Sequence, residues 1–287
     1  MKIAVSFSGQ TGYTNGRLGV GDKLDNNIVY NHLRKHVLEK YKEVDIFIHT
    51  WSIEDKKTLI ELYKPITIEC EKQRTFGIDL SNMSIHEKNQ EDANTLGFNL
   101  RYISQAYSMN KSLDYVISHE NKNNFKYDYV IVLRLDAIFT LDLDTTILNK
   151  DCINLQRKVH INKNKNIPIC WDNNANGLIH SSYVVIITTK LLNNSRYRDI
   201  YNYHYYNSTK DNIYSNVNPK NTFSMLMVLF GNNKCIESIP RDTIQLARRY
   251  YYENEIMFEN GKKIRYKFND NEKLKILWEN YNSFYCK

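Results

Sequence analysis

The stretch YVIVLRLDAIF, residues 129–139, sets two charged side chains into an apolar run. The run is typical of a buried strand, where an unpaired ion is rare because its desolvation costs several kcal/mol. Arg134 and Asp136 lie two positions apart and therefore on the same side of an extended chain. A carboxylate at this point can bind a divalent cation, and a guanidinium fork suits either a phosphate or that carboxylate. The alternatives are a phosphate-handling site and a structural ion pair.

Two earlier apolar runs, KIAVSFSG (2–9) and VDIFIHTW (44–51), also end in polar residues. The candidates for binding at these two ends are Ser8, Gly9, Gln10, His49, Thr50 and Trp51. An imidazole offers acid–base chemistry, and an indole offers a surface on which a nucleobase stacks. Each type also has a structural interpretation: a hydrogen-bonded core histidine, a core aromatic, or a glycine that ends a strand for backbone reasons alone.

The elements that position these ends alternate between strands and helices. Strands are expected at 2–9, 44–51, 64–70 and 129–139. The apolar spacing predicts a helix that Asp25 caps, with Val29, Leu33, Val37 and Tyr41 repeating every four residues, and a second helix over 96–116. Alternation of this kind predicts a parallel sheet with helices on both faces. Ligands bind beyond the carboxyl ends of such strands, so the three polar ends should converge.

The second half of the chain is less regular. Strands are expected at 152–156, 166–171 and 182–189, and a short buried element at 221–231. The stretch 272–285 carries an apolar stripe at helical spacing, which would dock on the domain, meet a partner or rest on a membrane surface. No linker composition divides the chain, so residues 1–287 are interpreted as a single domain. The change from regular to irregular elements divides it into residues 1–141 and residues 142–287, which the family resemblance given below interprets as a donor half and an acceptor half.

Several polar residues outside the strand ends are further candidates. Asp172 and His180, beside a glycine, are candidates for a general base and for acceptor binding. Those that could hold phosphate or a nucleotide are Arg17, Gln105, Ser108, Lys111, Arg248 and Arg249. For the helix residues among them a solvated polar face is the structural alternative, and for the arginines a surface patch.

Composition limits the classes of function. The formal net charge is +7 with a pI near 8.9, which favours anionic partners. The 22 tyrosines and this charge prompt a nucleic-acid-binding alternative, but the basic residues are scattered among acidic ones and no nucleic-acid motif is present. The five cysteines form no close CxxC pair, so neither a disulfide framework nor a structural zinc site is expected. A cytoplasmic location, or one at the inner face of the membrane, fits the absence of a signal peptide or apolar span.

Three motifs in order, SFSGQ, DIFIHTW and YDYVIVLRLDAIF, resemble landmarks of bacterial and viral surface-polysaccharide glycosyltransferases, including those related to the WavE lipopolysaccharide enzymes. The resemblance implies an α/β, GT-A-like fold: a Rossmann-type, mostly parallel sheet flanked by helices, with a mixed α+β acceptor half. It implies transfer of a sugar from a UDP-, GDP-, CMP- or dTDP-linked donor to a glycan or lipid-linked glycan of a capsule or lipopolysaccharide.

The chain departs from this resemblance at two places. Gly12 stands where such enzymes often have an arginine, so Arg17 is a candidate substitute. Of the Asp-x-Asp pair common in GT-A enzymes only Asp136 is present, with Arg134 at the first position. The resemblance implies Mg²⁺ or Mn²⁺ at Asp136, and a metal-independent enzyme is the alternative. Nucleotidyl transfer on a related α/β scaffold is the alternative activity, although SGQTGYTNGR is a poor version of its glycine-rich signature.

Overall fold

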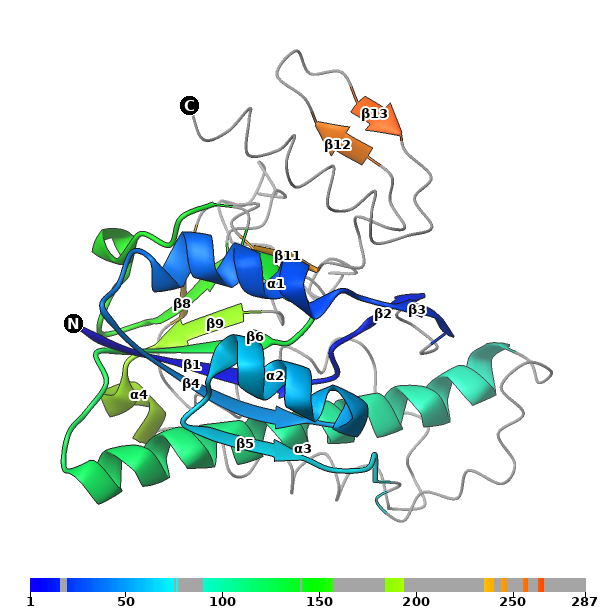
Figure 1. Cartoon of the computed structure of the whole chain (residues 1–287), viewed down its shortest axis with the longest axis horizontal. Coiled ribbons are helices and arrows are strands. Elements are labelled where there is room, and N and C mark those ends of the chain that lie inside the picture. Colours follow the sequence, from blue (N-terminus) through cyan, green and yellow to red (C-terminus); the bar gives the residue numbers. More distant parts are fainter. Residues whose placement is uncertain are drawn as a thin grey trace.

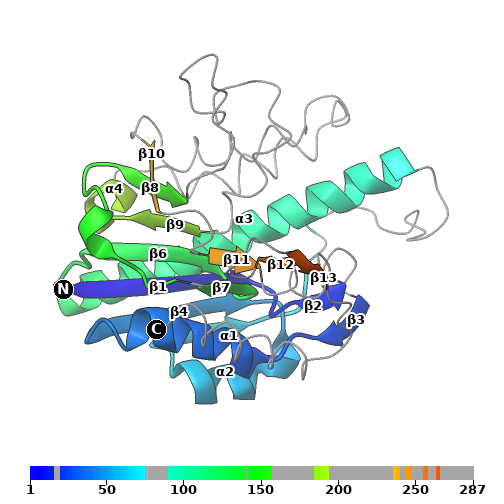
Figure 2. The ribbon, with the colours of Figure 1, turned by 90° about the horizontal axis from the view of Figure 1, so that it is seen from above.

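The computed structural model describes residues 1–15, 20–74, 76, 90–139, 141–156, 184–193, 235–239, 244–246, 255–257 and 263–265. Among these, the central feature is a seven-stranded sheet with the order β10-β8-β9-β6-β1-β4-β5, and most of its strands can be followed side by side in Figure 2. The strands are β1 (Lys2–Gly9), β4 (Glu43–Thr50), β5 (Thr67–Cys70), β6 (Tyr129–Arg134), β8 (Ile153–Gln156), β9 (Val184–Ile187) and β10 (Cys235–Ile239).

Six of these seven strands run parallel, and β9 runs antiparallel to both of its neighbours. From β1 the chain adds β4 and then β5 on one side, and it returns through a long helix to place β6 on the other side of β1. The expected α/β class, a mostly parallel sheet flanked by helices, is confirmed, and the GT-A likeness stays a prediction.

The central strand β1 is buried on both faces. Ile3, Val5 and Phe7 belong to one core cluster, and Ala4 belongs to the cluster on the opposite face. All four side chains are fully buried, as expected of a strand covered on both sides. Burial of each large apolar side chain contributes roughly 1.5–3 kcal/mol, so the position of β1 is strongly fixed.

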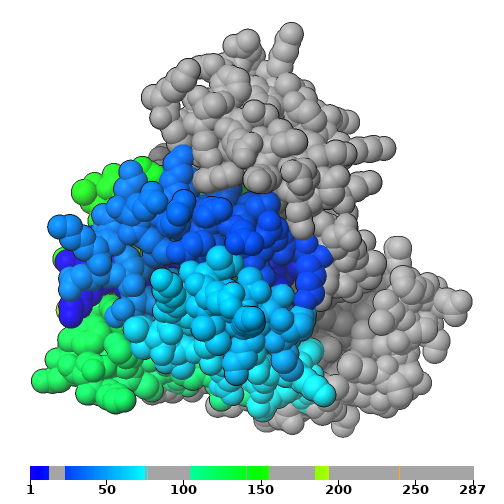
Figure 3. Space-filling view, in the orientation of Figure 1, coloured from blue at the N-terminus to red at the C-terminus, as the bar shows by residue number. Residues whose placement is uncertain are grey.

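One face of the sheet is covered by α1 (Asn26–Leu33), the π-helical turn Arg34–Leu38 and α2 (Lys56–Tyr63). Both helices lie in front of the sheet in Figure 1, and their atoms form the blue and cyan surface of Figure 3. The Asp25 side chain caps α1 by accepting from the Asn27 backbone N–H, as predicted. Leu33 and Val37 pack into the core beneath, which confirms the predicted apolar spacing.

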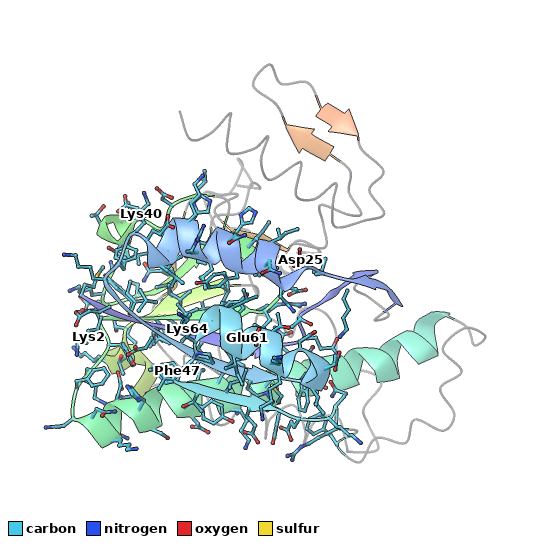
Figure 4. All side chains as sticks on the ribbon, viewed as in Figure 1. Lys2, Asp25, Lys40, Phe47, Glu61 and Lys64 are labelled. Atoms are coloured by element: carbon cyan, nitrogen blue, oxygen red, sulfur yellow. The ribbon has the colours of Figure 1, made fainter. Side chains whose placement is uncertain are left out.

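The other face is covered by α3 (Gln90–Asn123), a helix of 34 residues that contacts β1 and β4. Phe47 lies on this side of the sheet, where Figure 4 labels it. Ser104, Ser108 and Ser112 repeat every four residues and are buried. Small polar side chains at this spacing let the helix approach the sheet closely and bond to it. The predicted helix, 96–116, is contained in the longer one.

The remaining described elements are short. They are β2 (Tyr13–Asn15), β3 (Val20–Lys23), β7 (Ala137–Phe139), β11 (Ile244–Leu246), β12 (Glu255–Met257), β13 (Lys263–Arg265), α4 (Thr189–Asn193) and the 3-10 turns Ile53–Asp55 and Thr145–Ile147. β2 pairs with β3, β7 with β11 and β12 with β13, each antiparallel. The expected elements at 166–171, 221–231 and 272–285 lie outside the described residues.

The expected strand 129–139 is interrupted. β6 ends at Arg134, a turn holds Leu135 and Asp136, and β7 then leaves the main sheet to pair with β11. Of the part of the chain that the structure describes, no helix combines the length and apolar character that crossing a membrane requires.

Candidate functional site

The three predicted strand ends meet at one edge of the sheet. Ser8 on β1 is in register with His49 on β4 and with Arg134 on β6, so the three residues form one row across the sheet. The row lies at the carboxyl ends of the strands, on the side where Figure 1 shows β2, β3 and the beginning of α3. Because the chain adds strands on one side of β1 and then crosses to β6, the carboxyl ends of β1 and β6 mark the topological switch point, where open α/β sheets bind ligands.

Two glycines shape the loop that leaves β1. Gly9 has φ +96° and Gly12 has φ +95°, torsions that side-chain-bearing residues rarely adopt. Among the described residues, a Cβ added to Gly9 would meet no atom within 4 Å, so the described part of the chain leaves space beside its Cα. A Cβ added to Gly12 would lie 2.7 Å from Leu24 Cδ1 and 2.9 Å from Asp136 Cβ. Gly12 therefore permits the β1 loop to pack directly against Asp136.

Arg134 and Asp136 form a bidentate ion pair. Arg134 Nε donates to Asp136 Oδ1 at 2.7 Å, and Nη2 donates to Oδ2 at 2.8 Å. The Asp136 side chain is 2% exposed and that of Arg134 is 27% exposed. The buried carboxylate is therefore paired, as burial requires, while part of the guanidinium reaches the surface. This arrangement is the ion pair that was one of the two alternatives for the two-residue spacing, and it fixes the guanidinium at the switch point.

Residues that could hold a metal are sparse among those described. Within them no three His, Cys, Asp or Glu side chains gather closely enough to form a metal site. Each oxygen of the Asp136 carboxylate accepts from Arg134 and retains a lone pair, since a carboxylate has about four acceptor positions. A hard cation at Asp136 would thus take its other ligands from substrate phosphates and water. Asp136 as a metal ligand stays a prediction.

His49 lies inside a buried hydrogen-bond network. Its Nδ1 is 2.9 Å from Ser108 Oγ, and its Nε2 is 2.8 Å from Glu71 Oε1. Ser108 Oγ also accepts from the Gly9 backbone N–H at 2.8 Å. The side chains of His49 and Ser108 are both fully buried. The network thus connects the end of β4 and the middle of α3 to the last residue of β1.

The charges of this network follow from its surroundings. Burial lowers the pKa of His49, and the hydrogen bond and charge of Glu71 offset that effect only in part. Partial burial of Glu71 acts to raise its pKa, but hydrogen bonds from Arg74 and His49 outweigh burial and hold the carboxyl pKa below its ordinary value. The imidazole is therefore neutral and the carboxylate ionised at neutral pH.

Trp51 is a core aromatic in this structure. It is 7% exposed and stacks on Tyr107 with ring centroids 5.5 Å apart and an angle of 28° between the planes. His49 and Phe76 approach it edge-on. Among the described residues its indole N–H has no hydrogen-bond partner. One face of the indole is occupied by Tyr107, so a nucleobase would have to stack on the other.

Further hydrogen bonds pin the β1 loop. Thr11 Oγ1 donates to Asp55 Oδ2 at 2.7 Å, and the Thr11 backbone N–H donates to Ser52 Oγ at 3.1 Å. The buried Thr50 hydroxyl accepts from the Ser52 backbone N–H, so Thr50 serves the loop rather than facing solvent. Gln10, between the two glycines, is exposed at the sheet edge.

The other predicted residues are less central. Lys111 Nζ lies 3.6 Å from the carboxylate of Glu69, on the β5 side of the row, and Gln105 is half-buried on α3. The predicted residues Arg17, Asp172, His180, Arg248 and Arg249 lie outside the described residues.

Sequence reasoning missed Glu71 and Arg74. Both follow β5, and the carboxyl-end rule that selected the ends of β1, β4 and β6 applies to this strand as well.

No protein-family model matches the chain. No curated protein matches it. Two of the similar solved structures are of the glycosyltransferase GlyE of Streptococcus pneumoniae TIGR4. Their sequence identities to this chain are 13% and 14%, and their TM-scores are 0.41 and 0.40. Both matches cover 98% of this chain and 60% of GlyE. A nucleoside-diphosphate-sugar pyrophosphorylase from Vibrio cholerae RC9 has 11% identity and a TM-score of 0.36, covering 86% of this chain and 95% of that one. The chain thus spans about 60% of the GlyE chain. Likeness at this level identifies no activity.

Proposed function

We propose that the protein binds a nucleotide sugar across the carboxyl edge of β1, β4 and β6 and transfers the sugar to a glycan. The observation that carries this proposal is the row of Arg134, Ser8 and His49 at the switch point between β1 and β6. Ligands of open α/β sheets bind at such a place. The three motifs that resemble surface-polysaccharide glycosyltransferases end at this same edge, which supports the choice of ligand.

Arg134 is the residue best placed to act on the leaving group. Its guanidinium is held by two hydrogen bonds to Asp136 and is partly exposed at the end of β6. A cation fixed in advance stabilises the negative charge that develops on a departing nucleoside diphosphate. Because the Asp136 carboxylate already orders the fork, little side-chain freedom is lost on binding.

Asp136 would also hold Mg²⁺ or Mn²⁺, because a carboxylate is a hard oxygen ligand. Such an ion, when bound, acts as a Lewis acid toward the leaving phosphate. Arg134 already bonds both carboxylate oxygens, so the cation would share this carboxylate with a guanidinium. We therefore expect weak dependence of activity on the metal.

The acceptor half is proposed to be residues 142–287, with a capsule or lipopolysaccharide glycan as the acceptor. Asp172 or His180 would accept the proton of the attacking hydroxyl, since a carboxylate or imidazole within hydrogen-bond reach serves as a general base. A lipid-linked acceptor would place the enzyme at the cytoplasmic face of a membrane.

Thermal unfolding with UDP-, GDP-, CMP- and dTDP-linked sugars, with and without Mg²⁺ or Mn²⁺, tests the donor site. A ligand at 100 times its Kd should stabilise the native state by about 2.7 kcal/mol. Asp136→Asn should then lower turnover by about 10²–10³, the scale of removing one electrostatic stabiliser. Asp142→Asn is the matched control because Asp142 pairs with His36 and Lys40 rather than with Arg134. The absence of a shift with every nucleotide sugar contradicts the proposal.

The products separate sugar transfer from nucleotidyl transfer. A glycosyltransferase moves the sugar to an acceptor hydroxyl and releases a nucleoside diphosphate, or CMP from a CMP-sugar. A nucleotidyltransferase run in reverse needs pyrophosphate and yields a nucleoside triphosphate and a sugar phosphate. Chromatography of a reaction with and without pyrophosphate decides between them, and a triphosphate product would replace the proposed function with the alternative.

A further inference from the structure

His49 and Ser108 are fully buried at the candidate site, and Ser108 bonds to the last residue of β1. That residue is Gly9, whose backbone N–H donates to Ser108 Oγ at 2.8 Å. We infer that Glu71, His49 and Ser108 form a positioning network that fixes the Gly9 peptide and, through it, the loop of residues 9–12 in the conformation that receives the nucleotide. The inference rests on the proposed function, because it assigns these residues a task in the same site.

The protonation states determine which group of the network donates and which accepts in each hydrogen bond. Glu71 is ionised and accepts the Nε2–H of the neutral His49 ring, which leaves Nδ1 with a lone pair. The Ser108 hydroxyl donates to His49, whose Nδ1 at 2.9 Å and backbone carbonyl oxygen at 3.1 Å are its two acceptors. Its oxygen is then oriented to accept the Gly9 N–H. The order of donors therefore runs in one direction, from the end of β1 to the carboxylate.

The network is anchored at its outer end. Glu71 Oε2 accepts from Arg74 Nε at 2.9 Å and from Nη2 at 2.6 Å, while Oε1 holds His49. The Arg74 guanidinium in turn lies over the Tyr107 ring, 4.8 Å from its centroid. A carboxylate held by two partners keeps the imidazole in one orientation, as the outer hydrogen-bond partners of a catalytic or ligating histidine do.

Gly9 is tied on both sides. Its carbonyl accepts from the Trp51 backbone N–H at 3.3 Å, and the preceding carbonyl, of Ser8, accepts from the Leu135 N–H at 3.3 Å. The N–H bond to Ser108 is the contact that joins this peptide to α3. Gly9 has φ +96°, and an added Cβ there would meet no atom of the described residues within 4 Å. Loss of the bond to Ser108 would therefore let Gly9 change its backbone conformation. A ligand that approaches the backbone at this point would then meet a different surface.

Ser108→Ala tests the inference, and Ser112→Ala is its matched control. Both serines are fully buried on the same face of α3, four residues apart, and each bonds to β1. Ser112 bonds to the side chain of Ser6 in the middle of the strand, whereas Ser108 bonds to the backbone at its end. We expect Ser108→Ala to weaken binding of the best of UDP-, GDP-, CMP- and dTDP-linked sugars at least tenfold by calorimetry, and Ser112→Ala to change it less than twofold. Equal losses in the two variants would make Ser108 a packing residue and overturn the inference.

A second readout needs no nucleotide. In ¹⁵N NMR spectra the Gly9 amide should shift and lose protection from hydrogen exchange in Ser108→Ala but not in Ser112→Ala, and Glu71→Gln should shift it in the same direction by less. If wild-type protein binds none of the nucleotide sugars, the proposed function fails, and the Gly9 amide still decides whether the network positions the loop. An unchanged Gly9 amide in Ser108→Ala overturns the inference even where nucleotide binding is intact.

Discussion

Gly9 and Gly12 have almost the same backbone torsion and opposite surroundings. A Cβ on Gly9 would meet no atom of the described residues within 4 Å, while one on Gly12 would press on Leu24 and Asp136. The two positions therefore separate the effect of backbone strain from that of steric contact. That separation matters because Gly12 is the point at which the β1 loop approaches Asp136, which we propose for the donor site.

Alanine at each position gives a matched pair of variants. Gly9→Ala should cost about 1–3 kcal/mol from the unfavourable torsion alone. Gly12→Ala should lose a further 1–3 kcal/mol or so, because the new methyl group overlaps Leu24 Cδ1 and Asp136 Cβ. Urea denaturation monitored by circular dichroism measures both losses. Equal destabilisation of the two variants would show that the contact with Asp136 is easily relieved.

For single residues, the sequence predicted which side chains lie at the strand ends better than it predicted the direction in which each side chain points. The row of Ser8, His49 and Arg134 follows from the strand-end rule, and the structure confirms that the three ends meet. Burial of His49 beneath α3 was not predictable, because the sequence does not show which face of the strand the helix covers. The pairing of Arg134 with Asp136 was one of two stated alternatives, and whether the pair serves a ligand stays a prediction.

At the scale of elements, α1 is connected to β7 by a buried histidine. His32 Nδ1 donates to the Phe139 carbonyl at 2.6 Å. Burial lowers the pKa of His32 to about 3. Burial likewise lowers the pKa of His36 on the following turn, despite its bond to Asp142. Two imidazoles whose pKa values burial lowers make this segment an acid-sensitive part of the described fold.

The pH dependence follows from the sign of the His32 shift. The folded pKa lies below the unfolded value of about 6.5, so only the unfolded state takes up a proton between those two pH values. The contribution of neutral His32 to stability is full above about pH 6.5 and falls by up to ~1.4 kcal/mol per pH unit as the pH drops toward 3. Chemical denaturation at a series of pH values measures this slope.

His32→Asn and His32→Gln provide the comparison. Both remove the titrating group and should flatten the acid slope, but only asparagine places an amide N–H where Nδ1 lies. The asparagine variant should therefore be the more stable of the two at pH 7, by about 1 kcal/mol, the worth of one hydrogen bond. A slope equal to that of wild type in both variants would assign the acid sensitivity to other groups.

Some elements escaped prediction for identifiable reasons. α2, eight residues with the sequence KKTLIELY, is too short for its apolar period to stand out. The β2–β3 hairpin lies in a stretch rich in glycine and asparagine, a composition that is more typical of a loop than of strands. The sequence also does not mark the interruption of the strand after Arg134, because Leu135 and the residues of β7 are as apolar as β6 itself.

At the scale of the whole molecule, the sheet joins the two predicted halves. β9 pairs with β6 from Val130–Ile187 to Leu133–Val184, and β8 and β10 follow outward. Ile131 and Ile186 face each other in this pairing and both are fully buried. The division at residue 141 into donor and acceptor halves is therefore a prediction about function, whereas the fold crosses that boundary.

A fragment of residues 1–141 should consequently not fold on its own. Its β6 would become an unpaired edge with apolar residues on both faces, which is a template for aggregation. Size-exclusion chromatography and thermal melting of the fragment, beside the full chain, measure this. A monomeric fragment with a cooperative melt would show that β8, β9 and β10 are an independent addition.

The stacked indole of Trp51 has an optical consequence. It is enclosed by Tyr107, His49 and Phe76, and its backbone N–H bonds to Gly9, so its surroundings depend on the conformation of the β1 loop. Tryptophan emission responds to burial and to neighbouring imidazoles. With Trp171 and Trp278 replaced by phenylalanine, the fluorescence of the remaining indole would report events at the sheet edge without any added label.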